Sequence, residues 1–136
     1  RDAPPVMVAD FTYCHEDAGL ARERAERYLT RYLESLLEHY ELMGDHLGDT
    51  KGYEAYGQQT EVLRHVSFER YVEGFLATNA FGTPDQMLAK FEESYDVLGT
   101  FELATCCRFG GIPTEESVAS MQLFAEKVLP ELRSWA

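Results

Sequence analysis

The sequence predicts an α/β fold with parallel strands, because three strand-like runs are each followed by a helix-like segment. The strand-like runs are residues 6–13, 77–81 and 100–107. When a chain leaves one strand, forms a helix and enters the next strand, the two strands pair in parallel through a right-handed crossover. The 136 residues are expected to form a single domain over 1–136. A doubly wound sheet agrees with this pattern of elements.

The first unit joins residues 6–13 to the longest predicted helix. The run Val-Met-Val-Ala-Asp-Phe-Thr-Tyr is typical of a buried strand, and Asp10 interrupts it either as a strand-edge carboxylate or as an acid facing a ligand. A helix is predicted over residues 18–43, with Gly44 as its stop. Its apolar stripe has helical spacing and comprises Ala21, Ala25, Tyr28, Leu29, Tyr32, Leu33, Leu36, Leu37 and Tyr40.

Residues 45–59 are too long and too rich in glycine for a tight connection. They form either an ordered surface excursion or a lid that grips a partner with Tyr53, Tyr56 and Lys51. A helix is then predicted over residues 61–76, with a break near Gly74.

The second unit contains the strongest helix start in the sequence. After the strand at 77–81, Thr83 is predicted to cap the helix, Pro84 takes its first position, and Gln86 completes a capping box. Gly99 is expected to end this helix.

The third unit passes from the strand at 100–107 through Gly110 and Gly111 into the last helix. Glycines at such a junction permit a tight turn or a close approach to a ligand. Thr114 is the predicted cap of a helix that reaches Arg133, in which Pro130 should cause a kink or an end. In α/β folds this strand-to-helix junction is a common ligand site.

Composition excludes several classes of function. Twelve basic and twenty-four acidic residues give a net charge of −12, which opposes nucleic-acid binding. No apolar run of about 18 residues predicts a membrane span. Three cysteines and four histidines show no metal-ligand spacing, so no metal site and a reduced, cytoplasmic chain are expected. No known catalytic motif is found, so the catalytic residues stay unassigned, and Arg1 in place of Met indicates a processed chain or a fragment.

Several segments together resemble the luciferase-like flavin-dependent monooxygenases. The resembling segments are RFGGIP at 108–113, SMQLFAEKVLPEL at 120–132, FGTPDQMLAKFEES at 81–94, ARERAERYLTRYLESLLEHYEL at 21–42 and KGYEAY at 51–56. The resemblance extends from Val6 to Leu132 and concerns the C-terminal portion of such an enzyme. It implies that the chain forms the last three β/α units of a (β/α)8 TIM-type barrel, which is incomplete on its own.

The resemblance also implies flavin and dioxygen chemistry on a small-molecule substrate at the barrel mouth. Residues 10–14, 79–83 and 107–111 would lie there. Arg108, Gly110, Gly111 and Thr83 are the candidate cofactor-binding residues, although Thr83 is also explained by capping alone and Arg108 by a salt bridge at the rim.

The implied cofactor is FMN or a deazaflavin. The chain alone is not expected to bind it, because the phosphate-holding part of the family lies outside this sequence. The missing barrel half or a homo-oligomer is therefore the expected partner. The alternative is a non-catalytic structural or subunit protein derived from the same family.

Overall fold

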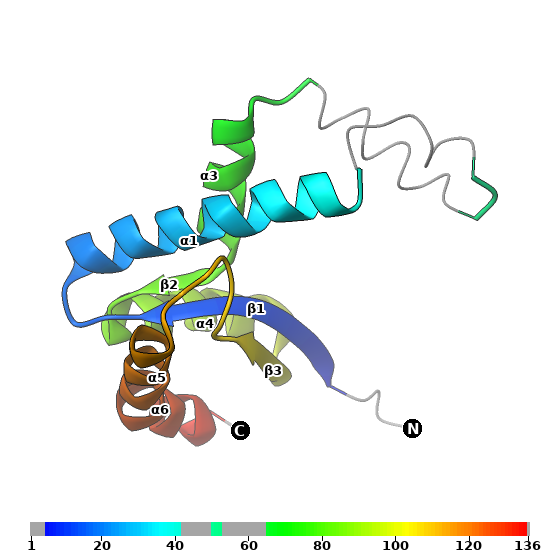
Figure 1. Cartoon of the computed structure of the whole chain (residues 1–136). Helices are drawn as coiled ribbons and strands as arrows, with labels where there is room; N and C mark the ends of the chain where they lie inside the picture. Colours follow the sequence, from blue (N-terminus) through cyan, green and yellow to red (C-terminus); the bar gives the residue numbers. More distant parts are fainter. Residues whose placement is uncertain (1–4, 42–49, 53–64, 136) are drawn as a thin grey trace.

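The computed structural model describes residues 5–41, 50–52 and 65–135, and Figure 1 shows their arrangement. The predicted loop at 45–59 and the start of the predicted helix at 61–76 lie almost wholly outside these residues. In chain order the elements are β1 (Val6–Cys14), α1 (Ala18–His39), α3 (Phe68–Thr78), β2 (Ala80–Gly82), α4 (Pro84–Leu98), β3 (Phe101–Cys106), α5 (Thr114–Leu123), the π-helical segment η1 (Phe124–Val128) and α6 (Leu129–Ser134).

The strands form one parallel sheet with the order β2-β1-β3. The first six residues of β1 pair with β3, from Val6 opposite Phe101 to Phe11 opposite Cys106. The last three residues of β1 pair with β2, ending with Cys14 opposite Gly82. The central strand is therefore the first strand of the chain, and its carboxyl end lies beside that of β2.

This order shows that the expected TIM-type barrel is wrong. In consecutive units of a barrel each strand pairs with the next one, so the second of three strands would lie in the middle. Here β1 lies in the middle, and the described strands form an open sheet. The sequence pattern specifies strand-then-helix units but not the order of pairing. The parallel α/β character of the prediction is correct, and the barrel is not.

One face of the sheet packs against α1 and α3 (Figure 1). Phe11 and Tyr13 are two residues apart along β1, so both side chains lie on this face and contact the core. The buried residues of the predicted α1 stripe pack against them. Phe109 from the segment after β3 closes the same core. Helix α1 ends at His39 with Tyr40 at the C-cap, a few residues before the predicted end, and Gly44 lies outside the described residues.

The other face packs against α4, α5, η1 and α6 (Figure 1). Cys14 and Ala80 are buried there, and the helices contribute Met87, Phe91 and Val128 to this second core. Helices therefore lie on both faces of the carboxyl half of β1, as a parallel sheet requires. In the amino half of the strand, by contrast, Val6 is 53% and Met7 is 65% exposed.

Three sequence predictions need local correction. Helix α3 continues through Gly74 instead of breaking there, and it includes Ala77 and Thr78, which were predicted to be strand. Gly74 is tolerated in α3 because it is exposed and this helix is anchored by buried residues on its other side. Helix α5 begins at Thr114, the residue predicted to cap it, with Pro113 at the cap position, and no side chain caps it.

Pro130 does not end the last helix. Its ring would collide with a carbonyl one turn earlier, and it has no N–H for the usual helical bond. The chain instead widens into the π-helical turn η1, where the Leu129 N–H donates to the Phe124 carbonyl, and it continues as α6. A helix that passes a proline in this way keeps Phe124 and Val128 buried on the same face.

The predicted start of α4 is confirmed in detail. The Thr83 hydroxyl accepts from the Gln86 N–H, the Gln86 side chain accepts from the Thr83 N–H, and Gly99 ends the helix. Replacing Thr83 by alanine should therefore lower the free energy of unfolding by about 0.5–2 kcal/mol. Urea denaturation midpoints will measure this cost. The control is Gln122→Ala on the exposed surface of α5, and equal midpoints for the two variants would mean that the cap contributes nothing.

Buried polar side chains join β1 to the start of β2. Asp10 accepts from the Ala80 N–H at 2.6 Å, and the Asn79 side-chain oxygen accepts from the Phe11 N–H at 2.9 Å. The Lys90 ammonium donates to the Asn79 and Leu76 carbonyls. These bonds satisfy backbone groups where the ladder between the strands has not yet begun. Of the two interpretations of Asp10, the structure supports the strand-edge carboxylate.

Asp10 should make stability depend on pH. Burial raises its pKa above the ordinary value of 3.8, and the Ala80 N–H and the charge of Lys90 offset only part of the rise. An acid with a raised pKa binds its proton more tightly in the folded state. The contribution of Asp10 to the free energy of unfolding is therefore complete below pH 3.8, and it is lost as the pH rises through the higher folded-state pKa.

The variant Asp10→Asn cannot ionise, so its stability relative to the unmodified protein should rise over that interval. Urea unfolding at a series of pH values measures the difference. Parallel stability curves for the two proteins would show that Asp10 does not titrate as inferred.

Candidate functional site

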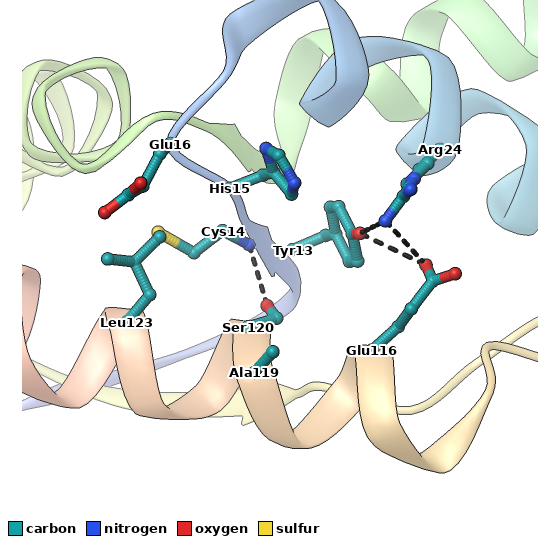
Figure 2. Close-up of a pocket in the computed structure, with 9 residues that line it drawn as sticks. All are labelled: Tyr13, Cys14, His15, Glu16, Arg24, Glu116, Ala119, Ser120 and Leu123. Atoms are coloured by element: carbon teal, nitrogen blue, oxygen red, sulfur yellow. Dashed lines mark hydrogen bonds and ion pairs between the residues drawn. The ribbon is translucent and has the colours of Figure 1, made fainter.

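A pocket of about 300 Å³ lies at the carboxyl end of β1, between the turn that follows the strand and helix α5 (Figure 2). We call it the β1 pocket. Its lining comes from the end of β1, the following turn, the first turns of α1 and one side of α5, and comprises Tyr13, Cys14, His15, Glu16, Arg24, Glu116, Ala119, Ser120 and Leu123.

Hydrogen bonds fix the turn that carries His15 and Glu16. The Cys14 N–H donates to the Ser120 hydroxyl oxygen at 2.8 Å, and the His15 N–H donates to the Gly82 carbonyl at 3.1 Å. Asp17 then caps α1 by accepting from the Leu20 N–H at 2.8 Å. The turn is therefore tied to α5, to β2 and to α1.

A polar cluster forms one wall of the pocket. A single oxygen of Glu116, Oε2, accepts from the Tyr13 hydroxyl at 3.3 Å and pairs with Arg24 at 3.4 Å (Figure 2). The same oxygen accepts from the Tyr28 hydroxyl at 3.1 Å. Burial raises the pKa of both tyrosines; at Tyr13 a hydrogen bond from Arg24 works against the rise, and at Tyr28 the Glu116 carboxylate adds to it. Both phenols therefore keep their protons at neutral pH and donate to Glu116.

The opposite wall is apolar. Cys14 is buried in the second core, and burial raises the pKa of its thiol to about 11. At neutral pH the thiol is protonated, so it serves as a packing group and not as a nucleophile. Leu123 and Ala119 complete this wall.

A larger hollow of about 610 Å³ adjoins the pocket at the end of β2. We call it the β2 hollow. It shares Glu16 and Leu123 with the β1 pocket, and its remaining lining comprises Thr83, Pro84, Asp85, Leu88, Lys127, Glu131 and Trp135. The two depressions follow the carboxyl edge of the sheet.

The four residues predicted from the sequence to bind a cofactor do not lie together in the structure. Thr83 lines the β2 hollow, whereas Arg108, Gly110 and Gly111 line neither depression. Arg108 is exposed, and its side chain makes no ion pair with any residue that the structure describes, so the rim salt bridge is not found there. Gly110 lies against the backbone of Tyr28 in α1. Their role in cofactor binding stays a prediction.

Of the segments expected at the ligand-binding edge, residues 10–14 supply Tyr13 and Cys14 to the pocket. Arg24 and Glu116 were not among the residues predicted from the sequence to form the site. The available signals were the spacing of Arg24 and Tyr28, which places both on one face of a helix, and the position of Glu116 in an acidic first turn. Only the tertiary fold brings those two helices together.

None of the helices in the described part of the chain has the length and apolar character that a membrane-spanning helix requires. Within the same residues, no group of His, Cys, Asp and Glu side chains is arranged to hold a metal ion.

Comparison with known proteins gives a likeness of fold. No family model matches the sequence. The structure is similar to the crystal structure of monooxygenase RslO1 from Streptomyces bottropensis, with a TM-score of 0.60 and 19% sequence identity. The similarity covers 96% of this chain but only 32% of that one, so the chain spans about a third of the length of the protein it resembles. The two proteins therefore share a fold over nearly all of this chain.

Proposed function

We propose that this chain is part of a flavin-dependent monooxygenase of the luciferase-like kind, and that the β1 pocket binds part of its small-molecule substrate. The observation that carries the proposal is the likeness of fold to a monooxygenase over 96% of the chain. The position of the pocket supports it, because ligands of α/β proteins bind at the carboxyl ends of parallel strands.

The residues at this edge do not fit the phosphate of FMN or of a deazaflavin cofactor. A phosphate needs cationic side chains or free backbone N–H groups. In the β1 pocket Arg24 already pairs with Glu116, and in the β2 hollow Lys127 shares the lining with the carboxylates of Glu16, Asp85 and Glu131. We therefore propose that the cofactor is held mainly by the rest of a larger enzyme or by a second copy of the chain.

In this division of roles, the described residues form the substrate pocket and orient the substrate in it. Tyr13, Tyr28 and Arg24 hold one oxygen of Glu116, so its second oxygen has a fixed direction. Cys14 and Leu123 form the apolar opposite wall. Fixed polar groups beside an apolar surface are the usual means by which a protein orients a small molecule.

A non-catalytic subunit is the alternative, and the exposed half of the sheet favours it. Val6 and Met7 are exposed on β1, and the outer edge of β3 pairs with no other strand among the described residues. An uncovered sheet edge is a surface on which another polypeptide can add a strand. In this alternative the chain would support a partner and perform no chemistry.

The test uses the natural protein that contains this sequence. Its intact mass and visible absorbance are measured, and labelled dioxygen is followed into organic products. We expect flavin absorbance and label incorporation in the natural assembly, and no quenching of FMN fluorescence by the isolated chain. A natural assembly without flavin or incorporation would favour the non-catalytic subunit. Tight FMN binding by the isolated chain would contradict the proposed division of roles.

A further inference from the structure

Two carboxylates of the β1 pocket have oxygens that are free to accept hydrogen bonds. All the bonds of Glu116 to the described residues go to Oε2, which leaves Oε1 as an acceptor. Glu16 is exposed at the mouth, and its carboxylate makes no hydrogen bond or ion pair with any residue in the described ranges. A molecule entering the pocket therefore meets acceptors from two elements, the turn after β1 and helix α5.

Positive charge in the lining is already engaged. The Arg24 guanidinium pairs with Glu116 and contacts the Tyr13 hydroxyl at 3.5 Å, so this pair adds no net charge. The His15 Nδ1 accepts from the Asp17 N–H at 2.9 Å, so this nitrogen is already bonded within the turn. In a formal count with histidine neutral, Arg24 and Glu116 cancel, and Glu16 leaves the pocket with a net negative charge.

The surroundings add to this negative charge. The β2 hollow shares Glu16 and contributes Asp85 and Glu131 against Lys127 alone. The whole chain has a net charge of −12. The negative electrostatic potential at this edge of the sheet repels an approaching anion and attracts a cation. The potential therefore favours cationic over anionic ligands before they reach the pocket.

The size of the pocket limits the ligand as well. A volume of about 300 Å³ is at the lower end of small-molecule sites, and the wall formed by Cys14, Ala119 and Leu123 suits a flat apolar ring. The polar side offers carboxylate oxygens, which accept hydrogen bonds from amines and hydroxyls.

We propose that the β1 pocket binds a small ring compound that carries an amine or a hydroxyl group, and that it excludes anionic analogues. This inference rests on the proposed function for the statement that the ligand is a substrate. The binding preference itself depends only on the charges and walls described above.

The test compares three probes that share one ring and differ in charge: benzylamine, benzyl alcohol and benzoate. Each is titrated into the purified chain and followed by calorimetry or by chemical shifts of pocket residues. We expect benzylamine to bind roughly tenfold more tightly than benzyl alcohol, which corresponds to about 1.4 kcal/mol, and benzoate not to bind. Added salt should weaken benzylamine binding and leave benzyl alcohol nearly unchanged.

Two variants and a matched control locate the effect. Glu16→Gln and Glu116→Gln should each reduce the preference for benzylamine over benzyl alcohol several-fold. The control Glu34→Gln removes the same charge from an exposed site on α1 outside the pocket and should leave the preference unchanged. Circular dichroism confirms that each variant is folded. Glu16→Gln is the decisive variant, because its side chain is exposed.

Benzoate binding as tightly as benzylamine, equal effects of Glu16→Gln and Glu34→Gln, or no binding of any probe would each overturn the inference. The outcome is independent of the flavin test. If the natural assembly incorporates labelled oxygen but the probes fail, the ligand class is wrong and the function stands. If the probes rank as expected without flavin chemistry, the site stands and the function is wrong.

Discussion

Replacing Gly110 by alanine should lower the free energy of unfolding by roughly 2–5 kcal/mol, the sum of two costs. The first is conformational, because Gly110 has φ +53°, a region that residues with a side chain adopt reluctantly. The second is steric, because a β-carbon at this position would overlap the carbonyl oxygen of Tyr28. That oxygen belongs to the backbone of α1, so no side-chain rotation can relieve the overlap.

Gly111→Ala is the matched control. Gly111 has φ +77°, but apart from its own chain neighbours no atom lies within 4 Å of the position its β-carbon would take. It should therefore show only the conformational cost of about 1–2 kcal/mol. Urea unfolding of both variants separates the two costs. Equal losses would mean that α1 does not approach Gly110 as closely as the structure indicates.

The Gly110 result also concerns the site, because Tyr28 both faces the glycine with its carbonyl and donates to Glu116 with its hydroxyl. The glycine pair was predicted to permit either a tight turn or a close approach to a ligand. At Gly110 the group that makes the close approach is the backbone of α1. A glycine pair indicates that something lies close to the backbone, and the sequence does not say what.

The helices and strands with local signals were predictable. The capping box of Thr83 and Gln86 and the stop at Gly99 depend only on neighbouring residues, and they are found as predicted. The strand at 6–13 was recognisable because both of its faces carry apolar side chains. Pro130 marked an irregularity correctly, but the choice of a π-helical turn instead of an end depends on keeping Phe124 and Val128 buried.

The pairing order and the polar wall of the pocket were not predictable. Whether β1 lies at an edge or in the middle depends on which strands its two sides meet, and β3 begins far from β1 in the sequence. The contact between Arg24 and Glu116 arises only when α1 and α5 are placed on the same end of the sheet. The barrel was predicted from the family resemblance because the sequence alone does not specify the pairing order. The observed order β2-β1-β3 in an open sheet shows that this prediction was wrong.

Tyr13→Ala should be the most damaging substitution in the pocket. Tyr13 is 1% exposed, belongs to the first core and lies against Tyr28 with ring centroids 6.4 Å apart. Truncating a buried aromatic side chain removes its burial energy and leaves a cavity, which costs about 3–5 kcal/mol. The loss should also release Glu116 from one of its donors.

Tyr13→Phe separates packing from hydrogen bonding, because it keeps the ring and removes only the hydroxyl. The bonds of that hydroxyl are long, 3.3 Å to Glu116 and 3.5 Å to Arg24, so the cost should be at the low end of about 0.5–1.5 kcal/mol. Urea unfolding measures both variants, and benzylamine titration of Tyr13→Phe then reports on the pocket in a folded protein. If Tyr13→Phe were as destabilising as Tyr13→Ala, the hydroxyl and not the ring would stabilise this end of the sheet. In that case Glu116 would be a structural partner of the core instead of a group held ready for a ligand.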